Sequence, residues 1–200
     1  MDVLRLFIAV DISDAQRAAV GELLRDLQKG AQFTKAHPAW VGPDAMHLTL
    51  HFLGGVDSAR VPALVSGVET ALAGAGGAGG VGAFDFALRG LGVFPHPHAP
   101  KVLWVGVKEG REALCDLAQR IESALVPWGY EPERRAFHPH LTLARIKSMS
   151  GAGALMDVIH GHRAAAPGVG RVDHVTLYRS ELKPTGAVYT ALHVWPLGPQ

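Results

Sequence analysis

The sequence predicts a mixed α/β fold in which two related lobes pack face to face. Segments with the apolar spacing of strands alternate with segments that have the spacing of helices. The order strand, helix, loop, strand, helix, strand occurs twice along the 200 residues. Each copy contains the tetrapeptide His-Leu-Thr-Leu, which starts at His47 and again at His140. We therefore expect one bilobal domain over residues 1–200, with pseudo-repeats at about 1–90 and 100–200.

The first half begins with a buried strand at residues 4–10, where large and β-branched apolar residues predominate. Ser13 can cap the following helix, in which apolar residues recur at helical spacing until Gly30. The first His-Leu-Thr-Leu lies in an alternating segment, residues 46–53, which predicts a second strand. The half ends with a helix from about 57 to 72, a Gly/Ala-rich connector at 71–82 and a strand at 84–88.

The second half follows a turn-rich loop at residues 90–100 and repeats this order. Residues 102–107 predict a doubly buried strand, and residues 112–125 an amphipathic helix. The segment from His138 to Arg145 alternates again and contains the second His-Leu-Thr-Leu. The remaining expected elements are a short helix at about 154–160 and strands at 172–178 and 187–194.

The composition narrows the possible function classes. Hydrophobic residues make up 48% of the chain and charged residues 18%, which favours a well-filled core over disorder. The net charge of +1 argues against a protein that covers long nucleic acid, but it leaves room for a local basic pocket. Cys115 is the only cysteine, so no intramolecular disulfide can form. With no signal-like or membrane-length apolar run, we expect a cytoplasmic protein.

The repeated motif places two kinds of polar side chain on one face of each strand. His47 and Thr49 are two positions apart and project the same way, roughly 7 Å apart, while the leucines point to the opposite face. His140 and Thr142 have the same spacing. If the lobes bring both motifs to a solvent-filled cleft, a neutral histidine can deprotonate water and a protonated one can protonate a leaving oxygen.

The same cleft would suit a phosphate group. The two threonine hydroxyls can hydrogen-bond its non-bridging oxygens, and the guanidinium of Arg145 can offset their charge. Arg145 lies at an odd spacing from His140, so it faces the cleft only if a bulge or the strand end turns it inward.

A zinc site is the main alternative for these histidines. His47 with His51, or His138 with His140, could supply ligands, and His47 and His51 share a face of a regular strand. No carboxylate or cysteine accompanies either pair, so we expect no metal. The Gly/Ala-rich connector lacks the Lys-Ser/Thr of a phosphate-binding loop, and the chain has no Gly-x-Ser-x-Gly nucleophile motif.

The two His-Leu-Thr-Leu segments resemble the paired His-x-Thr-x motifs of the two-histidine phosphoesterase superfamily. The resemblance is strongest to its LigT-type branch, the RNA 2′,3′-cyclic phosphodiesterases, also called 2′-5′ RNA ligases, and it covers essentially the whole chain. One departure is Asp44-Ala45-Met46 before His47, where the family commonly has Asn-Leu. The other matching segments, in the family's order, are 5–10, 40–41, 52–54, 90–95, 103–107, 144–145 and 177–180.

This resemblance implies a bilobal fold with two antiparallel sheets around a central cleft and helices outside. It implies hydrolysis of RNA 2′,3′-cyclic phosphate ends to 2′-phosphates without metal or cofactor, and reversible 2′-5′ joining. His140 would act as the base towards water, and His47 as the acid. Phe7 matches an aromatic residue that the family places near the base from the opening strand, which implies a substrate contact; a plain core phenylalanine is the alternative interpretation. The implied partners are RNA ends, such as those of tRNA fragments or short oligonucleotides, with no membrane and no obligate protein partner.

Two hypotheses from other classes remain open at this point. The chain could be a module that binds RNA ends without turnover. It could also be a related phosphodiesterase for a small nucleotide, such as an ADP-ribose cyclic phosphate or a 2′-5′ oligoadenylate.

Overall fold

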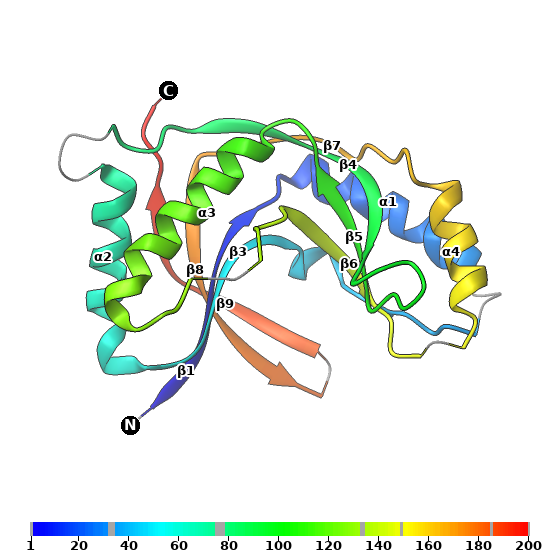
Figure 1. Ribbon diagram of the computed structural model, residues 1–200, viewed down its shortest axis with the longest axis horizontal. Coiled ribbons are helices and arrows are strands. Elements are labelled where there is room, and N and C mark those ends of the chain that lie inside the picture. Colours follow the sequence, from blue (N-terminus) through cyan, green and yellow to red (C-terminus); the bar gives the residue numbers. More distant parts are fainter. Residues whose placement is uncertain are drawn as a thin grey trace.

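Two antiparallel sheets with helices on their outer sides form the molecule (Figure 1). The structure is a computed structural model that describes residues 2–31, 35–74, 79–132, 135–148, 150–184 and 186–199. The predicted α/β fold with two antiparallel sheets is confirmed. Residues 75–78 of the Gly/Ala-rich connector lie outside the described residues.

Sheet A has the strand order β3-β1-β8-β9, and sheet B the order β2-β6-β5-β4-β7. The strands of sheet A are β3 (His47–Asp57), β1 (Val3–Asp11), β8 (His174–Lys183) and β9 (Gly186–Pro196). Those of sheet B are β2 (Ala39–Trp40), β6 (His140–Arg145), β5 (Val102–Val107), β4 (Phe84–Phe94) and β7 (Gly168–Val172). Short 3₁₀ helices cover Pro43–Ala45, Ser58–Arg60 and Val126–Trp128.

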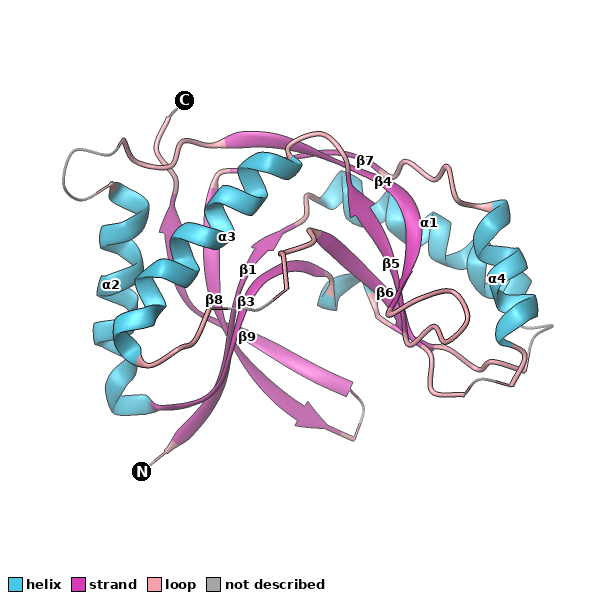
Figure 2. Ribbon diagram, in the orientation of Figure 1, coloured by secondary structure: helices cyan, strands magenta, loops and turns pink. Residues whose placement is uncertain are grey.

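The α-helices pack in pairs on the two sheets (Figure 2). Helices α2 (Val61–Ala73) and α3 (Arg111–Leu125) contact β9 and β3 of sheet A. Helices α1 (Asp14–Ala31) and α4 (Ala152–Gly161) contact β7 and β4 of sheet B. We call the face of each sheet that lies opposite its helices the inner face. No helix in the described part of the chain is both long and apolar enough to cross a bilayer.

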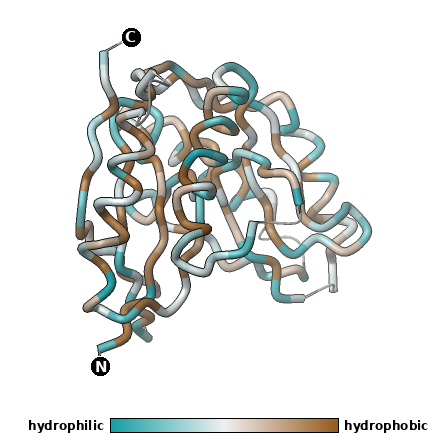
Figure 3. The backbone as a smooth tube through the Cα atoms, turned by 60° about the vertical axis from the view of Figure 1, so that its left-hand side comes forward, coloured by the Kyte–Doolittle hydropathy of each residue, from teal (hydrophilic) through white to brown (hydrophobic). Residues whose placement is uncertain are grey.

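The apolar core lies between each sheet and its helices. Hydrophobic stretches recur along the strands and helices in Figure 3, and their side chains form one core cluster. Leu48 and Leu141, the second residues of the two motifs, are 0% exposed. Burial of one such leucine stabilises the fold by about 1.5–3 kcal/mol. Because side chains alternate along a strand, this burial turns the neighbouring histidines and threonines to the inner faces.

The predicted cap of α1 is confirmed and is part of a reciprocal capping box. The backbone N–H of Gln16 donates to the hydroxyl of Ser13 (3.2 Å), and the backbone N–H of Ser13 donates to Oε1 of Gln16 (3.2 Å). Nε2 of Gln16 also donates to the carbonyl oxygen of Gly168 (3.4 Å). The cap therefore also ties α1 to the start of β7.

Each sheet combines strands from both halves of the chain. Strand β4 of the first half lies in sheet B, and β8 and β9 of the second half lie in sheet A. Within each half, the motif strand pairs antiparallel with the first strand of that half, β3 with β1 and β6 with β5. Because each sheet contains strands of both halves, the sheets do not separate the pseudo-repeats expected at about 1–90 and 100–200. Those pseudo-repeats stay a prediction.

Two predicted segments differ from the structure. The strand expected at 172–178 is divided at the exposed Asp173, where the chain leaves sheet B and enters sheet A. Val172 and Val175 are both 0% exposed, so the apolar pattern does not reveal the change of sheet. The loop expected at 90–100 is strand up to Phe94, because β4 continues beyond Gly90 after a register shift against β5.

Candidate functional site

The two motif strands meet although they belong to different sheets. Strand β3 is an edge strand of sheet A, and it contacts β6 of sheet B. His47 and His140 are the first residues of these strands, and both are half-buried, as are Thr49 and Thr142. The structure thus brings the strands of the four predicted motif residues together, with these side chains on the inner faces.

A β-bulge follows the motif in β3. Thr49 pairs with Ala9, but His51 pairs with Ile8, so Leu50 is an extra residue without a partner in β1. A bulge reverses the side-chain alternation beyond it. His51 is consequently buried on the helix side, where its ring contacts Tyr130, rather than beside His47. The expectation that His47 and His51 share a face is therefore wrong, because it assumed a regular strand.

The same bulge occurs in β6. Thr142 pairs with Trp104, but Ala144 pairs with Leu103, so Leu143 is the extra residue. The reversed alternation turns Arg145, the exposed last residue of β6, to the inner face. The charge of Arg145 acts on the ring of His140, whose pKa it helps to lower. In a regular strand the odd spacing between His140 and Arg145 would turn Arg145 to the opposite face. The bulge therefore gives Arg145 its inward direction.

Aromatic rings surround His47. The ring of Phe7 stacks on it with centroids 4.6 Å apart, and the ring of Tyr189 meets it edge-on at 5.1 Å. Phe7 also stacks on Tyr178 at 5.3 Å and is only 2% exposed. It therefore supports the imidazole of His47, and the contact with substrate predicted for Phe7 has little exposed surface available to it.

Burial controls the protonation of His47. Loss of solvent lowers its pKa to about 4, although a hydrogen bond with the backbone of Ala45 and the negative charge of Asp11 both favour the charged ring. His47 is therefore neutral at pH 7. Asp11 lies opposite His47 in the antiparallel pairing of β1 with β3.

The carboxylate of Asp11 accepts hydrogen bonds from three side chains of β8. The hydroxyl of Tyr178 donates to Oδ1 (2.7 Å), and the hydroxyl of Thr176 (3.1 Å) and Nε2 of His174 (3.3 Å) lie against Oδ2. Burial, followed by the bond to Asp11, raises the pKa of Tyr178, so its hydroxyl remains a donor. Asp11 is not among the site residues that the sequence motifs predicted. A signal was present, because Asp11 and Phe7 lie on the same face of the opening strand.

His140 has different neighbours. Its Nδ1 lies 2.7 Å from the backbone carbonyl oxygen of His138 and donates to it, which leaves Nε2 as the acceptor. Phe94 meets the ring edge-on at 5.0 Å, and Trp104 lies at 6.3 Å. Burial lowers the pKa of His140, and the positive charges of His138 and Arg145 act in the same direction. The hydrogen bond to the His138 carbonyl opposes this shift.

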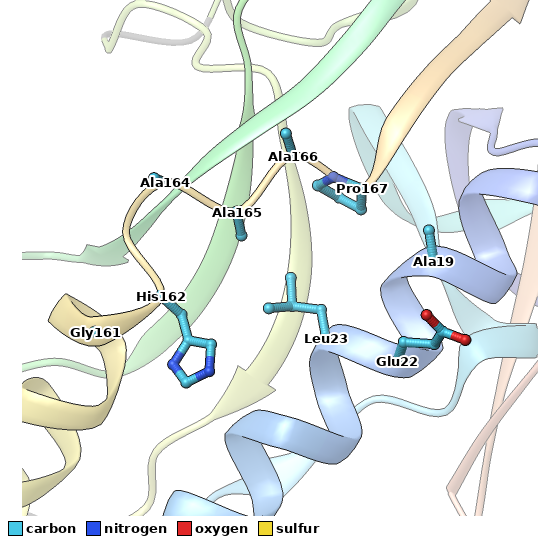
Figure 4. A pocket seen from close by; sticks show the side chains of 9 residues that line it. All are labelled: Ala19, Glu22, Leu23, Gly161, His162, Ala164, Ala165, Ala166 and Pro167. Carbon is cyan, nitrogen blue, oxygen red and sulfur yellow. The ribbon is translucent and has the colours of Figure 1, made fainter.

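No three His, Cys, Asp or Glu side chains within the described ranges gather in a way that could hold a metal ion. A separate pocket of about 460 Å³ lies between α1 and the segment after α4 (Figure 4). None of the predicted site residues lines it, and small apolar side chains predominate. Its lining residues are Ala19, Glu22, Leu23, Gly161, His162, Ala164, Ala165, Ala166 and Pro167.

Comparison with known proteins matches most of the chain to one family. Residues 13–184 match the family model described as the 2′-5′ RNA ligase superfamily. A protein of Methanothermobacter thermautotrophicus named RNA 2′,3′-cyclic phosphodiesterase is 34% identical over 193 residues, which cover 96% of this chain and 98% of that protein. A protein of Aquifex aeolicus with the same name is 29% identical and covers 99% of this chain and 100% of its own length.

Two solved structures also superimpose on nearly the whole chain. The structure of TT0787 of Thermus thermophilus superimposes with a TM-score of 0.77 and 27% identity, covering 98% of this chain and 100% of that chain. The structure of Escherichia coli LigT complexed with 3′-AMP superimposes with a TM-score of 0.74 and 26% identity, covering 98% and 99%.

Proposed function

Because the chain belongs to the 2′-5′ RNA ligase superfamily, we propose that it hydrolyses RNA 2′,3′-cyclic phosphate ends to 2′-phosphates, with His47 and His140 as its acid–base pair. One observation carries this proposal. Two copies of His-x-Thr, each followed by a bulge, project from the inner faces of two strands that contact each other across the sheets. This arrangement suits a phosphorus atom held between two imidazoles.

The proposed reaction is an in-line displacement at phosphorus. Nε2 of His140 takes a proton from water as the water oxygen bonds to phosphorus. The bond from phosphorus to the ribose 3′ oxygen breaks, and the imidazolium of His47 gives its proton to that oxygen. The product carries a 2′-phosphate and a free 3′-hydroxyl, so protons and bonds balance. A 5′-hydroxyl that replaces water would give a 2′-5′ linkage by the same steps.

The charges around the two histidines support these opposite roles. Asp11 favours the protonated form of His47, whereas Arg145 and His138 favour the neutral form of His140. Burial lowers the pKa of both rings and keeps them neutral at pH 7, so the productive form has to gain one proton. An anionic phosphate beside His47 would favour that proton by direct Coulomb attraction.

The remaining predicted residues would hold the phosphate. Thr49 and Thr142 can donate hydroxyl hydrogen bonds to its non-bridging oxygens from the two sheets. The guanidinium of Arg145 can neutralise the charge that develops on those oxygens. Phe7 would act indirectly, by fixing the plane of the His47 ring through its stacking contact.

End-group analysis tests this proposal. An RNA oligomer with a 2′,3′-cyclic phosphate is incubated with the chain, and the product end is identified as a 2′- or 3′-phosphate. We expect a 2′-phosphate, and a fall in rate of about 100- to 10,000-fold in His47→Ala and in His140→Ala. His96→Ala, which removes an exposed imidazole from a loop, serves as the control. Full activity in either motif variant would show that the acid–base pair is wrong.

The same assay separates the alternatives. Stoichiometric binding of the RNA end without product would favour a binding module. Faster turnover of an ADP-ribose cyclic phosphate or a 2′-5′ oligoadenylate than of an RNA end would favour the small-nucleotide enzyme. We expect activity to survive a chelator, and inhibition that added zinc reverses would favour a metal site.

A further inference from the structure

Two ring nitrogens beside His140 are buried without a hydrogen-bond partner in the described part of the chain. They are Nε1 of Trp104 and Nδ1 of His138. The centroids of these two rings lie 5.0 Å apart, and they lie 6.3 Å and 6.5 Å from the ring of His140. Buried indole N–H groups normally have a partner, because an unpaired one loses its hydrogen bonds with water and gains nothing in return. The proposed reaction uses neither nitrogen, so both need another explanation.

The packing of the indole ring fixes the direction of its N–H group. Trp104 lies on the inner face of sheet B, where it pairs with Thr142 of β6 and Gly92 of β4. A Cβ at Gly92 would overlap the ring, and a Cβ at Gly106 would lie 3.1 Å from it. The two glycines therefore leave the space that the indole fills, and Phe94 contacts the indole with centroids 5.1 Å apart. The N–H group of Trp104 cannot turn to solvent without a change in this packing.

The chemistry of the two nitrogens selects what can bind between them. Burial, followed by the positive charge of Arg111, lowers the pKa of His138, and contact with its own backbone opposes this shift only in part. The ring is therefore mainly neutral at pH 7 and has one accepting nitrogen, whereas the indole can only donate. A metal ion would meet the indole hydrogen, and an anion would meet the lone pair of the imidazole. A water molecule suits both groups, because it accepts from one and donates to the other.

We propose that Trp104 and His138 bind one water molecule that fixes the ring of His138, and with it the carbonyl that orients His140. The N–H of the indole donates to this water, and the water donates to Nδ1 of His138. The backbone carbonyl oxygen of His138 accepts from Nδ1 of His140 at 2.7 Å, which leaves Nε2 as the acceptor. The inference rests on the proposed function, which assigns His140 as the base towards water. Trp104 and His138 are positioning residues in this role.

Two features make the ring and the carbonyl of His138 depend on each other. The buried Pro139 follows directly, and a proline confines the preceding residue to an extended backbone. Phe94 meets the rings of His138 and His140 edge-on, with centroids 5.6 Å and 5.0 Å away. A displaced His138 ring would therefore disturb both the carbonyl and the packing of His140.

NMR of the unchanged chain tests the water site. We expect a dipolar cross-peak between water and the indole proton of Trp104, with the sign of a long-lived contact, because an enclosed water is part of the structure. A rotating-frame spectrum separates this contact from chemical exchange of the proton. The indole proton of Trp195 is the internal control, since its Nε1 donates to the carbonyl oxygen of Val65 (3.2 Å). It should show no such cross-peak.

Trp104→Phe tests the positioning role, because it removes the N–H group and keeps an aromatic ring. We expect kcat on a 2′,3′-cyclic phosphate end to fall about fivefold, while KM changes less than about twofold. The nitrogen-15 chemical shifts of His140 should move from those of one tautomer towards a mixture. His138→Ala should reproduce both effects, and His138→Gln, whose amide oxygen can accept from the water, should retain most of the activity. Trp128→Phe, which removes the indole N–H beside Gly67 of α2, is the matched control.

Absence of the Trp104 cross-peak in the folded chain would overturn the water site. Unchanged kcat in Trp104→Phe, or a fall in kcat without a change in the tautomer of His140, would overturn the positioning role. If this variant does not fold, the cross-peak and the comparison of His138→Gln with His138→Ala still decide. If the unchanged chain shows no turnover, the proposed function fails, and the cross-peak and the nitrogen-15 shifts still test this inference.

Discussion

The region around His47 and the region around His140 share a backbone plan but differ in chemistry. Both have a half-buried histidine at the start of a strand, a threonine two positions later and a bulge at the next leucine. The His47 region adds stacked aromatic rings and a carboxylate. Both rings hydrogen-bond the backbone, and the His140 region adds a guanidinium and a second histidine.

This difference shows how a repeated motif can place two histidines in opposite electrostatic surroundings. The bulge exposes a new inner-face position in each strand, and that position carries Arg145 on one side and Phe52 on the other. A cation suits the non-bridging oxygens of a phosphate, whereas Phe52 presents an exposed apolar ring. The charges of Asp11 and Arg145 then act on the two imidazoles in opposite directions, since Asp11 favours protonated His47 and Arg145 favours neutral His140.

The largest effect is expected when the His140 region loses its cation. Arg145→Gln should lower kcat/KM for a cyclic phosphate end about 100-fold, because charge on the phosphate oxygens is no longer offset. Arg145→Lys should recover part of the loss, since it restores the charge but not the two-pronged geometry. Steady-state kinetics of the three proteins measures this. Equal activity in Arg145→Gln would mean that the two regions do not differ in phosphate binding.

The pH profile tests the protonation states directly. Burial lowers the pKa of His47 to about 4 and that of His140 below the ordinary 6.5. The productive form holds one proton on the pair, so kcat/KM in the free enzyme should peak below pH 6.5. It should fall on the acid side near pH 4, and by about tenfold per pH unit well above the upper pKa. A maximum at pH 8, in protein whose circular dichroism is unchanged, would contradict this assignment.

Asp11 distinguishes the two histidines by charge. Asp11→Asn removes the carboxylate that favours protonated His47, so the limb near pH 4 should move to lower pH and kcat/KM at neutral pH should fall about tenfold. Tyr178→Phe keeps the charge and removes only one hydrogen-bond donor. It should leave the position of that limb nearly unchanged. If both variants shift the limb equally, the effect of Asp11 is structural rather than electrostatic.

The smallest effect is expected from repacking beneath His140. A Cβ at Gly92 would overlap the ring of Trp104, so Gly92→Ala must displace a side chain that packs against His138. We expect a loss of about threefold in kcat/KM, with the limb near pH 4 unmoved. Gly21→Ala, where nothing lies within 4 Å of the new methyl group, is the matched control. A shift of the His47 limb in Gly92→Ala would mean that the two regions are mechanically coupled.

The sequence by itself determined the local plan of this protein. The alternation around His47 and His140 and the spacing of leucines predicted both motif strands, the helices between them and the inward direction of histidine and threonine. The Ser13 cap was likewise visible. These features depend on neighbours within a few residues, because strand and helix periodicity decide which side chains share a face.

Only the tertiary structure decided the rest. The bulges at Leu50 and Leu143 come from register against β1 and β5, and they determine where His51, Phe52 and Arg145 point. The exchange of strands between sheets and the gathering of Tyr178 and Tyr189 around Phe7 likewise join segments far apart in the chain. Long-range pairing sets these contacts, and hydrophobic periodicity carries no information about which strand will be the partner.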